Sequence, residues 1–368
     1  GEIMFIELPT KELKKALYNL LLTAFKDKNS ILSSTFIEVD RDKLLLSSTN
    51  LTTSFKTAIG ISETDTQKLT FSLNTEKLYN IIKQITEDHI KLNITDKTVD
   101  ILSPRFRAQL KREDETLYPK PEKEKKKNVA TIKGETIKKL IHLTAFSAGK
   151  NSINQEYNSI FLKLTKSSIT TVATDGYRLE ETKKEELDSE EESDEAQFLI
   201  DIKGAVLLQR LLENETTTVS INDKNVYFNC DNNEIQTRLI QATFPDYEAI
   251  IPKTRKDIVV KTKELEDAVS SVLTISPRGF INISSLEEGQ IKLSSSNEEG
   301  ETIDYTLNEV ETGSRLEFTV NGKYVTDFLK LVQSEYITIT FNNKNSPILF
   351  SATDEPYYCR YMVAPIND

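Results

Sequence analysis

Hydrophobic and polar positions repeat along the chain at a nearly fixed distance. Each copy is a β-type triplet that ends in an N-capping residue, followed by apolar residues at helical spacing. The copies begin at Phe71, Phe198 and Phe318, which lie 127 and 120 residues apart, and their capping residues are Asn74, Asp201 and Asn321. An alternating strand and a polar turn follow each helix, and these turns (residues 95–97, 222–224 and 342–344) keep the same intervals. The pattern predicts a threefold internal repeat.

Each repeat is expected to contain a strand, a helix, several strands, a second helix and further strands. Thr10 is predicted to cap the first helix, whose apolar stripe is Leu13, Ala16, Leu17, Leu20 and Leu21. The second helix of the middle repeat has the apolar set Val206, Leu207 and Leu211. Segments such as His89–Ile94 alternate like half-buried antiparallel strands. These patterns predict an α+β fold of three domains, each with two helices packed on antiparallel sheets.

Two polar, proline-containing segments mark the expected domain boundaries. Residues 113–128 contain Pro119 and Pro121, and residues 244–257 contain Pro245 and Pro252. We therefore expect domains at 1–127, 128–256 and 257–368. An acidic run at 183–195 is interpreted as a solvated loop within the middle domain.

The composition favours a soluble, globular protein that is not an enzyme. Of 368 residues 38% are apolar, and no apolar run approaches the roughly 20 residues that span a bilayer. Cys230 and Cys359 are far apart and form no disulfide framework, which suggests a reducing cytoplasm. His89 and His142 have no neighbours that would complete a catalytic or metal-binding set. We expect no catalytic residues, no metal and no cofactor.

The charge is distributed unevenly between the predicted helices and the rest of the chain. The net charge is −11, yet the six helical windows hold 15 Lys and Arg against 7 Asp and Glu. The helical windows therefore carry a net charge of +8, and the remaining residues carry a net charge of −19. Helices of equivalent domains would share one surface in a closed ring. Such a surface binds duplex DNA through its phosphates without choosing a sequence.

Three motifs complete the pattern: Val172-Ala173-Thr174-Asp175-Gly176-Tyr177-Arg178-Leu179, Phe244-Pro245-Asp246-Tyr247 and the C-terminal Tyr361-Met362-Val363-Ala364-Pro365-Ile366. Together with the repeat, they resemble the bacterial sliding clamp family, the β subunits of the DNA polymerase III holoenzyme. The resemblance implies a cytoplasmic, non-enzymatic processivity factor of DNA replication that forms a head-to-tail homodimeric ring around double-stranded DNA. It also implies that the clamp loader, the replicative polymerase, other polymerases and repair proteins bind through short Leu- and Phe-containing peptides.

The resemblance assigns residues to three surfaces. The dimer interface would place Phe106 and Ala108 opposite Leu273 and Ile275. The DNA-facing helices would present Lys14, Lys15, Lys26, Lys77, Lys138, Lys139, Lys150, Lys203, Arg210 and Lys330. The partner-peptide cleft would be formed by Tyr157, Thr174, Gly176, Tyr177, Arg178, Leu179, Pro245, Ile250, Met362, Val363, Ala364, Pro365 and Ile366.

The sequence departs from the family pattern at the cleft. Ala364 stands where the family usually has Met, and Ala249 where a basic residue is common. The preference for particular peptides is therefore left open.

Two other classes of function fit the sequence less well. A repeat scaffold that binds proteins through its sheets would not require the charge division between helices and sheets. A hydrolase centred on Asp175, with Asp246 as its partner, lacks a base or metal set. Leu179, Pro245 and Val363 could also be ordinary core residues at a domain junction.

Overall fold

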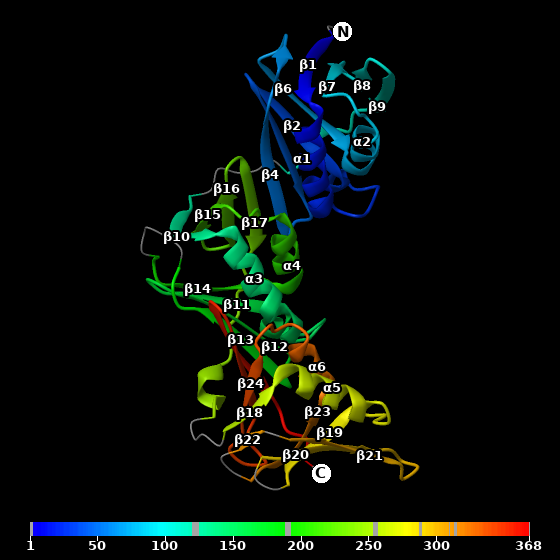
Figure 1. Ribbon diagram of the computed structural model, residues 1–368. Coiled ribbons are helices and arrows are strands. Elements are labelled where there is room, and N and C mark those ends of the chain that lie inside the picture. The colour runs from blue at the N-terminus through cyan, green and yellow to red at the C-terminus, as the bar shows by residue number, and fades with distance from the viewer. Residues whose placement is uncertain are drawn as a thin grey trace. The chain divides into compact units, whose positions relative to one another are not determined.

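The protein is described by a computed structural model that covers residues 3–119, 125–187, 193–252, 257–286, 289–308, 310–312 and 315–367 (Figure 1). Residues 188–192 of the predicted acidic loop and Pro121 of the first linker lie outside the described residues. The chain divides into two compact units: Gly1–Glu135 with Val206–Leu239, and Thr136–Ala205 with Ile240–Asp368. No helix in the described ranges is long and apolar enough to cross a bilayer.

The first unit contains two antiparallel sheets. Helices α1 (Thr10–Thr23) and α2 (Thr75–Ile82) pack side by side, and α1 also packs on β3 and β4. The five-stranded sheet has the order β5 (Glu63–Thr64), β1 (Met4–Pro9), β7 (His89–Ile94), β8 (Thr98–Ser103) and β9 (Phe106–Lys111). The eight-stranded sheet has the order β10 (Lys127–Lys133), β15 (Thr216–Ile221), β16 (Asn225–Cys230), β17 (Asn233–Arg238), β4 (Thr53–Gly60), β3 (Lys43–Thr49), β2 (Ser34–Asp40) and β6 (Lys68–Asn74).

The second unit also contains two antiparallel sheets. Helices α5 (Thr262–Leu273) and α6 (Gly322–Leu329) pack together, and α5 covers β20 and β21. The nine-stranded sheet has the order β14 (Ala196–Asp201), β11 (Ser159–Leu164), β12 (Ile169–Thr174), β13 (Arg178–Lys184), β26 (Tyr357–Val363), β25 (Ile348–Asp354), β24 (Tyr336–Thr340), β18 (Asp257–Lys261) and β22 (Glu311–Thr312). The four-stranded sheet has the order β21 (Thr302–Leu307), β20 (Ile291–Ser296), β19 (Phe280–Ser285) and β23 (Glu317–Asn321).

The order of elements confirms the repeat. Apart from the short strands β5 and β22, each third of the chain runs strand, helix, four strands, helix and three strands. The middle repeat, which carries α3 (Gly134–Thr144) and α4 (Ile202–Leu211), contributes strands to both units. β17 pairs with β4 in the first unit, and β13 pairs with β26 in the second. Sheets therefore continue from one repeat into the next.

The predicted caps of the second helices are confirmed. The side chains of Asn74, Asp201 and Asn321 accept hydrogen bonds from backbone N–H groups two or three residues later, at 2.8–3.0 Å. The strand His89–Ile94 also buries Ile90, Leu92 and Ile94 as expected.

The prediction that Thr10 caps α1 is wrong. Pro9 occupies the cap position and Thr10 is the first helical residue, with its hydroxyl group buried. The backbone N–H of Thr10 instead donates to the carbonyl of Asp88, at 2.8 Å. Equivalent bonds join Gly134 to Glu215 and Thr262 to Glu335. The residue just before the strand that follows the second helix of each repeat therefore caps the first helix, and a local sequence window does not reveal this contact.

The apolar stripe of α4 also differs from the prediction. Val206 is 43% exposed, and the buried positions are Ala205, Leu208 and Leu211. In α1, Leu21 is only half-buried and lies outside the fully buried stripe. Helical spacing alone does not determine which of two neighbouring helix faces is buried, because the burial depends on tertiary packing.

Candidate peptide-binding and DNA-facing sites

The turn between β12 and β13 is held by its own side chains. Asp175 Oδ1 accepts hydrogen bonds from the backbone N–H groups of Tyr177 (2.9 Å) and Arg178 (3.0 Å). Gly176 has a φ of +91°, and a Cβ atom there would lie 3.2 Å from Cε2 of Tyr157. Glycine is therefore favoured by both the backbone and the ring above it. The fixed turn leaves Tyr177 68% exposed.

Arg178 contacts two carboxylate groups and two aromatic rings of the same unit. Its Nε donates to Asp175 Oδ2 at 2.9 Å, and its Nη1 donates to Asp327 Oδ2 at 2.7 Å. The guanidinium group also lies over the rings of Tyr324 (4.4 Å) and Phe146 (5.6 Å). Asp327 and Tyr324 belong to α6, 149 and 146 positions further along the chain, and no sequence motif predicted their contact with Arg178. Arg178 thus joins the turn to α6.

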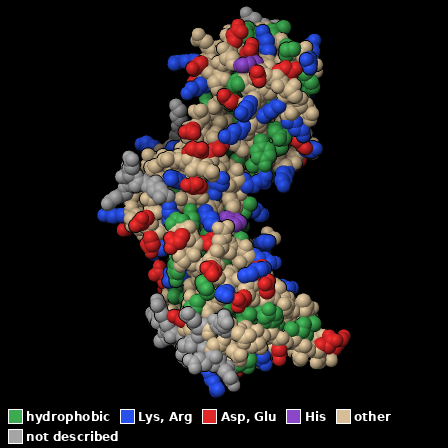
Figure 2. All heavy atoms as spheres, viewed as in Figure 1, with side chains coloured by type: hydrophobic (Ala, Val, Ile, Leu, Met, Phe, Trp, Pro, Cys, Tyr) green, Lys and Arg blue, Asp and Glu red, His purple; other side chains and the backbone are tan. Residues whose placement is uncertain are grey.

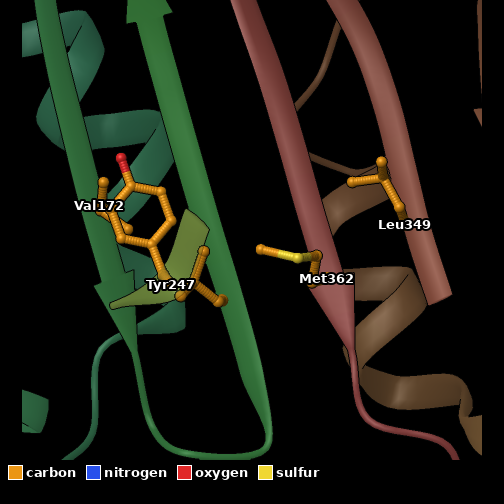
Figure 3. Packing of buried hydrophobic residues seen from close by; sticks show 5 residues of the cluster. Val172, Tyr247, Leu349 and Met362 are labelled. Carbon is orange, nitrogen blue, oxygen red and sulfur yellow. The ribbon is translucent and has the colours of Figure 1, made fainter. Parts of the chain in front are cut away.

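A buried apolar cluster lies beside this turn (Figure 3). Its members are Val172, Leu179, Tyr247, Leu349 and Met362. Leu179 and Met362 are register partners where β13 pairs with β26. Burial raises the pKa of the Tyr247 phenol far above its usual range. Phe161, Phe244 and Ile251 pack against this cluster, and the first two rings stack with centroids 5.1 Å apart.

The predicted cleft residues other than Arg178 fall into three groups by exposure. Thr174, Leu179, Met362 and Val363 are buried. Ile250 is 48% exposed, and Gly176, Tyr177 and Pro245 are also exposed. Tyr157 and the tail residues Ala364, Pro365 and Ile366 are half-buried. The buried cluster therefore forms the floor of this candidate site. The exposed and half-buried residues around it form the rim of the site, which a ligand could contact.

The C-terminal tail connects two parts of the second unit. The N–H of Ala364 donates to the carbonyl of Tyr177, and that of Ile366 donates to the carbonyl of Thr319, both at 2.8 Å. Ile366 also lines a cavity of about 810 Å³ together with Phe280, Asn282 and Thr319. The tail therefore turns from the β12–β13 turn onto the four-stranded sheet.

A buried carboxyl group lies in the sheet where β13 meets β26. Glu180 is fully buried, its Oε1 accepts a hydrogen bond from Thr182 at 3.0 Å, and no described residue hydrogen-bonds its Oε2. Burial is the main cause that raises the pKa of Glu180 well above its usual value, and the neighbouring Glu181 adds to the effect.

Replacing Glu180 by Gln should change how stability depends on pH. The raised pKa stabilises the fold below the pKa of the unfolded carboxyl, and that contribution is lost as pH rises through the folded pKa. The difference in unfolding free energy between Glu180→Gln and wild type should therefore move in favour of the variant from pH 4 to pH 8. Urea unfolding across this range measures it. A difference that stays constant with pH would contradict the prediction.

The predicted DNA-facing residues differ in their surroundings. Lys15, Lys26, Lys77, Lys150, Lys203, Arg210 and Lys330 are exposed, whereas Lys14, Lys138 and Lys139 are half-buried. Lys139 is paired with the buried Asp354 at 3.3 Å, and Lys14 donates to the carbonyl of Ile85. Lys15 is paired with Glu213 at 2.9 Å. Lys14 and Lys139 are therefore less available to a ligand than the exposed residues.

The predicted dimer residues lie at free sheet edges and helix ends. β9 is an edge strand on which half-buried Phe106 and Ala108 alternate with exposed Arg107 and Gln109. β21 is an edge strand of the other unit. Leu273 and Ile275 at the end of α5 are half-buried. Free edges of this kind can pair with another chain.

Comparisons with known proteins cover nearly the whole chain. Residues 7–120, 131–246 and 248–367 match the models of the N-terminal, central and C-terminal domains of the DNA polymerase III beta subunit. A beta sliding clamp from Buchnera aphidicola is 26% identical over 330 residues, which cover 88% of this chain and 89% of the relative.

Solved structures have the same fold. The DNA polymerase III subunit beta from Pseudomonas aeruginosa superposes with a TM-score of 0.91 at 22% identity, covering 99% of this chain and 100% of that chain. The corresponding subunit from Thermotoga maritima gives a TM-score of 0.88 at 24% identity, with the same coverage.

Proposed function

Because the chain belongs to the bacterial sliding clamp family, the β subunits of DNA polymerase III, we propose that two copies close head to tail into a ring around duplex DNA. The ring would act in the bacterial cytoplasm as a processivity factor without catalysis of its own. It would tether the replicative polymerase, and clamp loader subunits, other polymerases and repair proteins would also bind it. The domains would be 1–127, 128–256 and 257–368.

The charge on the helices is the observation that carries this proposal. Lys83, Arg210 and Lys330 are exposed and occupy equivalent positions at the ends of α2, α4 and α6, 127 and 120 residues apart. When the domains form a ring, cations at equivalent positions of the three domains would lie on the same surface of the ring. Contacts of these cations with phosphates would give weak, salt-sensitive binding that does not depend on sequence.

Charge complementarity between the two free edges supports head-to-tail closure. Arg105 and Lys111 are exposed in and beside β9, on which the exposed Arg107 is paired with Asp100 at 3.1 Å. The hairpin that leads into β21 carries the exposed Glu299 and Glu301, and Asp304, which is paired with Lys292 at 3.7 Å, follows in the strand. Exposed basic residues beside β9 of one unit and acidic residues in the hairpin before β21 of the other favour contact between these two edges of different copies. Phe106 and Ala108 would then pack near Leu273 and Ile275.

The surface around the β12–β13 turn is proposed to bind partner peptides. Tyr177, Pro245 and Ile250 are exposed beside the buried floor, and the tail residues 364–366 border the same turn. Leu and Phe side chains of a short peptide would be desolvated against these groups. Because two carboxylates already bind Arg178, its proposed role is to hold the turn in place.

A matched pair of triple variants tests the DNA-facing surface. Changing Lys83, Arg210 and Lys330 to Glu should reduce retention on primed circular DNA at least about tenfold, because three phosphate contacts become repulsive. Changing Lys97, Lys224 and Lys344 to Glu alters the net charge equally, in exposed turns at equivalent positions outside the helices. This control should retain DNA like wild type. Equal retention by both variants would contradict a helix-lined DNA surface.

A further inference from the structure

Two tyrosine rings lie together on the helical surface of the first repeat. Tyr18 of α1 is 45% exposed, and its ring centroid lies 6.2 Å from that of the half-buried Tyr79 of α2. Tyr18 lies outside the buried stripe of α1, on the face that carries Lys11, Lys14 and Lys15. The pair is therefore part of a surface and not of the core.

Cations flank both rings. Arg210 Nη2 donates to the hydroxyl group of Tyr18 at 3.3 Å, and Lys83 Nζ lies 5.5 Å from the centre of the Tyr79 ring. Lys14 reaches the carbonyl of Ile85, just after α2, so it lies beside the same pair of helices. Figure 2 shows a hydrophobic patch over α1 with Lys and Arg side chains around it. Such a patch suits an anionic ligand that also has flat apolar faces.

The pair is specific to one repeat. When the helices are aligned by their first residues and buried stripes, Tyr18 corresponds to His142 and Ser270. Tyr79 corresponds to Val206 and Thr326. The basic position of Lys83 recurs as Arg210 and Lys330, but the two rings do not recur. General attraction to phosphates therefore accounts for the cations and leaves the tyrosines unexplained.

We propose that Tyr18 and Tyr79 form a stacking platform for unpaired bases of single-stranded DNA, with Arg210 and Lys83 contacting the adjacent phosphates. Aromatic side chains in a basic groove are the usual means of binding single strands, because every base offers a π-face. Bases within a duplex are already stacked on one another and cannot take up this position. The proposal rests on the proposed DNA-facing role of the helices and adds a ligand that the cations alone would not select.

Binding of a labelled dT oligonucleotide and of a duplex of equal length, followed by anisotropy at low salt, tests the platform. The double variant Tyr18→Leu, Tyr79→Leu should weaken binding of the single strand about tenfold or more and leave duplex binding within about twofold. Tyr18→Phe with Tyr79→Phe should keep single-strand binding, because the rings remain. The control Tyr336→Leu, Tyr358→Leu removes two exposed rings from strands of the other unit and should change neither affinity.

A direct signal is also accessible because the chain contains no Trp. A Tyr18→Trp variant has a single Trp, whose emission should be quenched by the dT strand and not by the duplex. Equal losses for both DNAs in the Leu variant, or no quenching by the single strand, would overturn the proposal. If the reversal of Lys83, Arg210 and Lys330 also left DNA retention unchanged, the proposed function would fail as well. If that reversal releases DNA and only the tyrosine results are negative, the platform alone is wrong.

Discussion

Deletion of the tail from Ala364 onward should lower affinity for a Leu- and Phe-containing partner peptide about a hundredfold. Anchor residues of an interface typically contribute 2 kcal/mol or more each, and the tail residues Pro365 and Ile366 would form one wall of the site. The backbone N–H of Ala364 donates to the carbonyl of Tyr177, at the turn that would form the opposite wall. The cut begins after Val363 because Met362 and Val363 are buried in β26. Fluorescence titration with a labelled peptide measures the effect.

A shorter deletion provides the matched control for this experiment. Removing only the residues from Asn367 onward leaves the half-buried tail residues in place, and Asn367 is exposed. Its affinity should equal that of wild type. Thermal unfolding of both variants checks that the nine-stranded sheet remains intact. If the longer deletion bound peptide as tightly as wild type, the partner surface would lie elsewhere.

Phe106→Asp should convert the dimer into a monomer at low micromolar concentration. The side chain lies on the free edge strand β9, and a carboxylate buried at the contact without a partner costs about 3–5 kcal/mol. This corresponds to a weakening of the dimer by at least about a hundredfold. Light scattering after size exclusion should report the mass of one 41.9 kDa chain.

Phe25→Asp is the control for the dimer experiment. It makes the same chemical change at a 41% exposed Phe in the same repeat, after α1 and away from the edge strand. This variant should remain dimeric. A Phe106→Asp protein that is still a dimer at low micromolar concentration would place the contact away from this strand.

Regular features of the fold could be predicted from the sequence because they depend on neighbouring residues. The period of the repeat, the Asn and Asp caps of the second helices and the alternation of His89–Ile94 are all local or periodic signals. The first-helix caps could not be predicted, since the carbonyl groups that cap Thr10, Gly134 and Thr262 belong to residues about 70 to 80 positions away.

Prediction of the candidate site had the same limit. The resemblance assigned the turn motif and the C-terminal motif to one cleft, and only the structure shows the contact between them, which is the pairing of β13 with β26. That pairing buries Leu179 and Met362, so floor and rim residues could not be separated from the sequence. The ion pair of Arg178 with Asp327 spans 149 positions and required the packing of α6 to be known.

The position of β26 also governs when the second unit can be completed during protein synthesis. This strand follows every other described strand in the sequence, yet it lies at the centre of the nine-stranded sheet, with β13 on one side and β25 on the other. While β26 is still inside the ribosome, the sheet consists of two halves, each with an exposed strand edge. Exposed edges attract other chains. The second unit therefore stays open to misassembly until β26 has left the exit tunnel, and a chain that stops before Tyr357 has a divided sheet and not merely a shortened one.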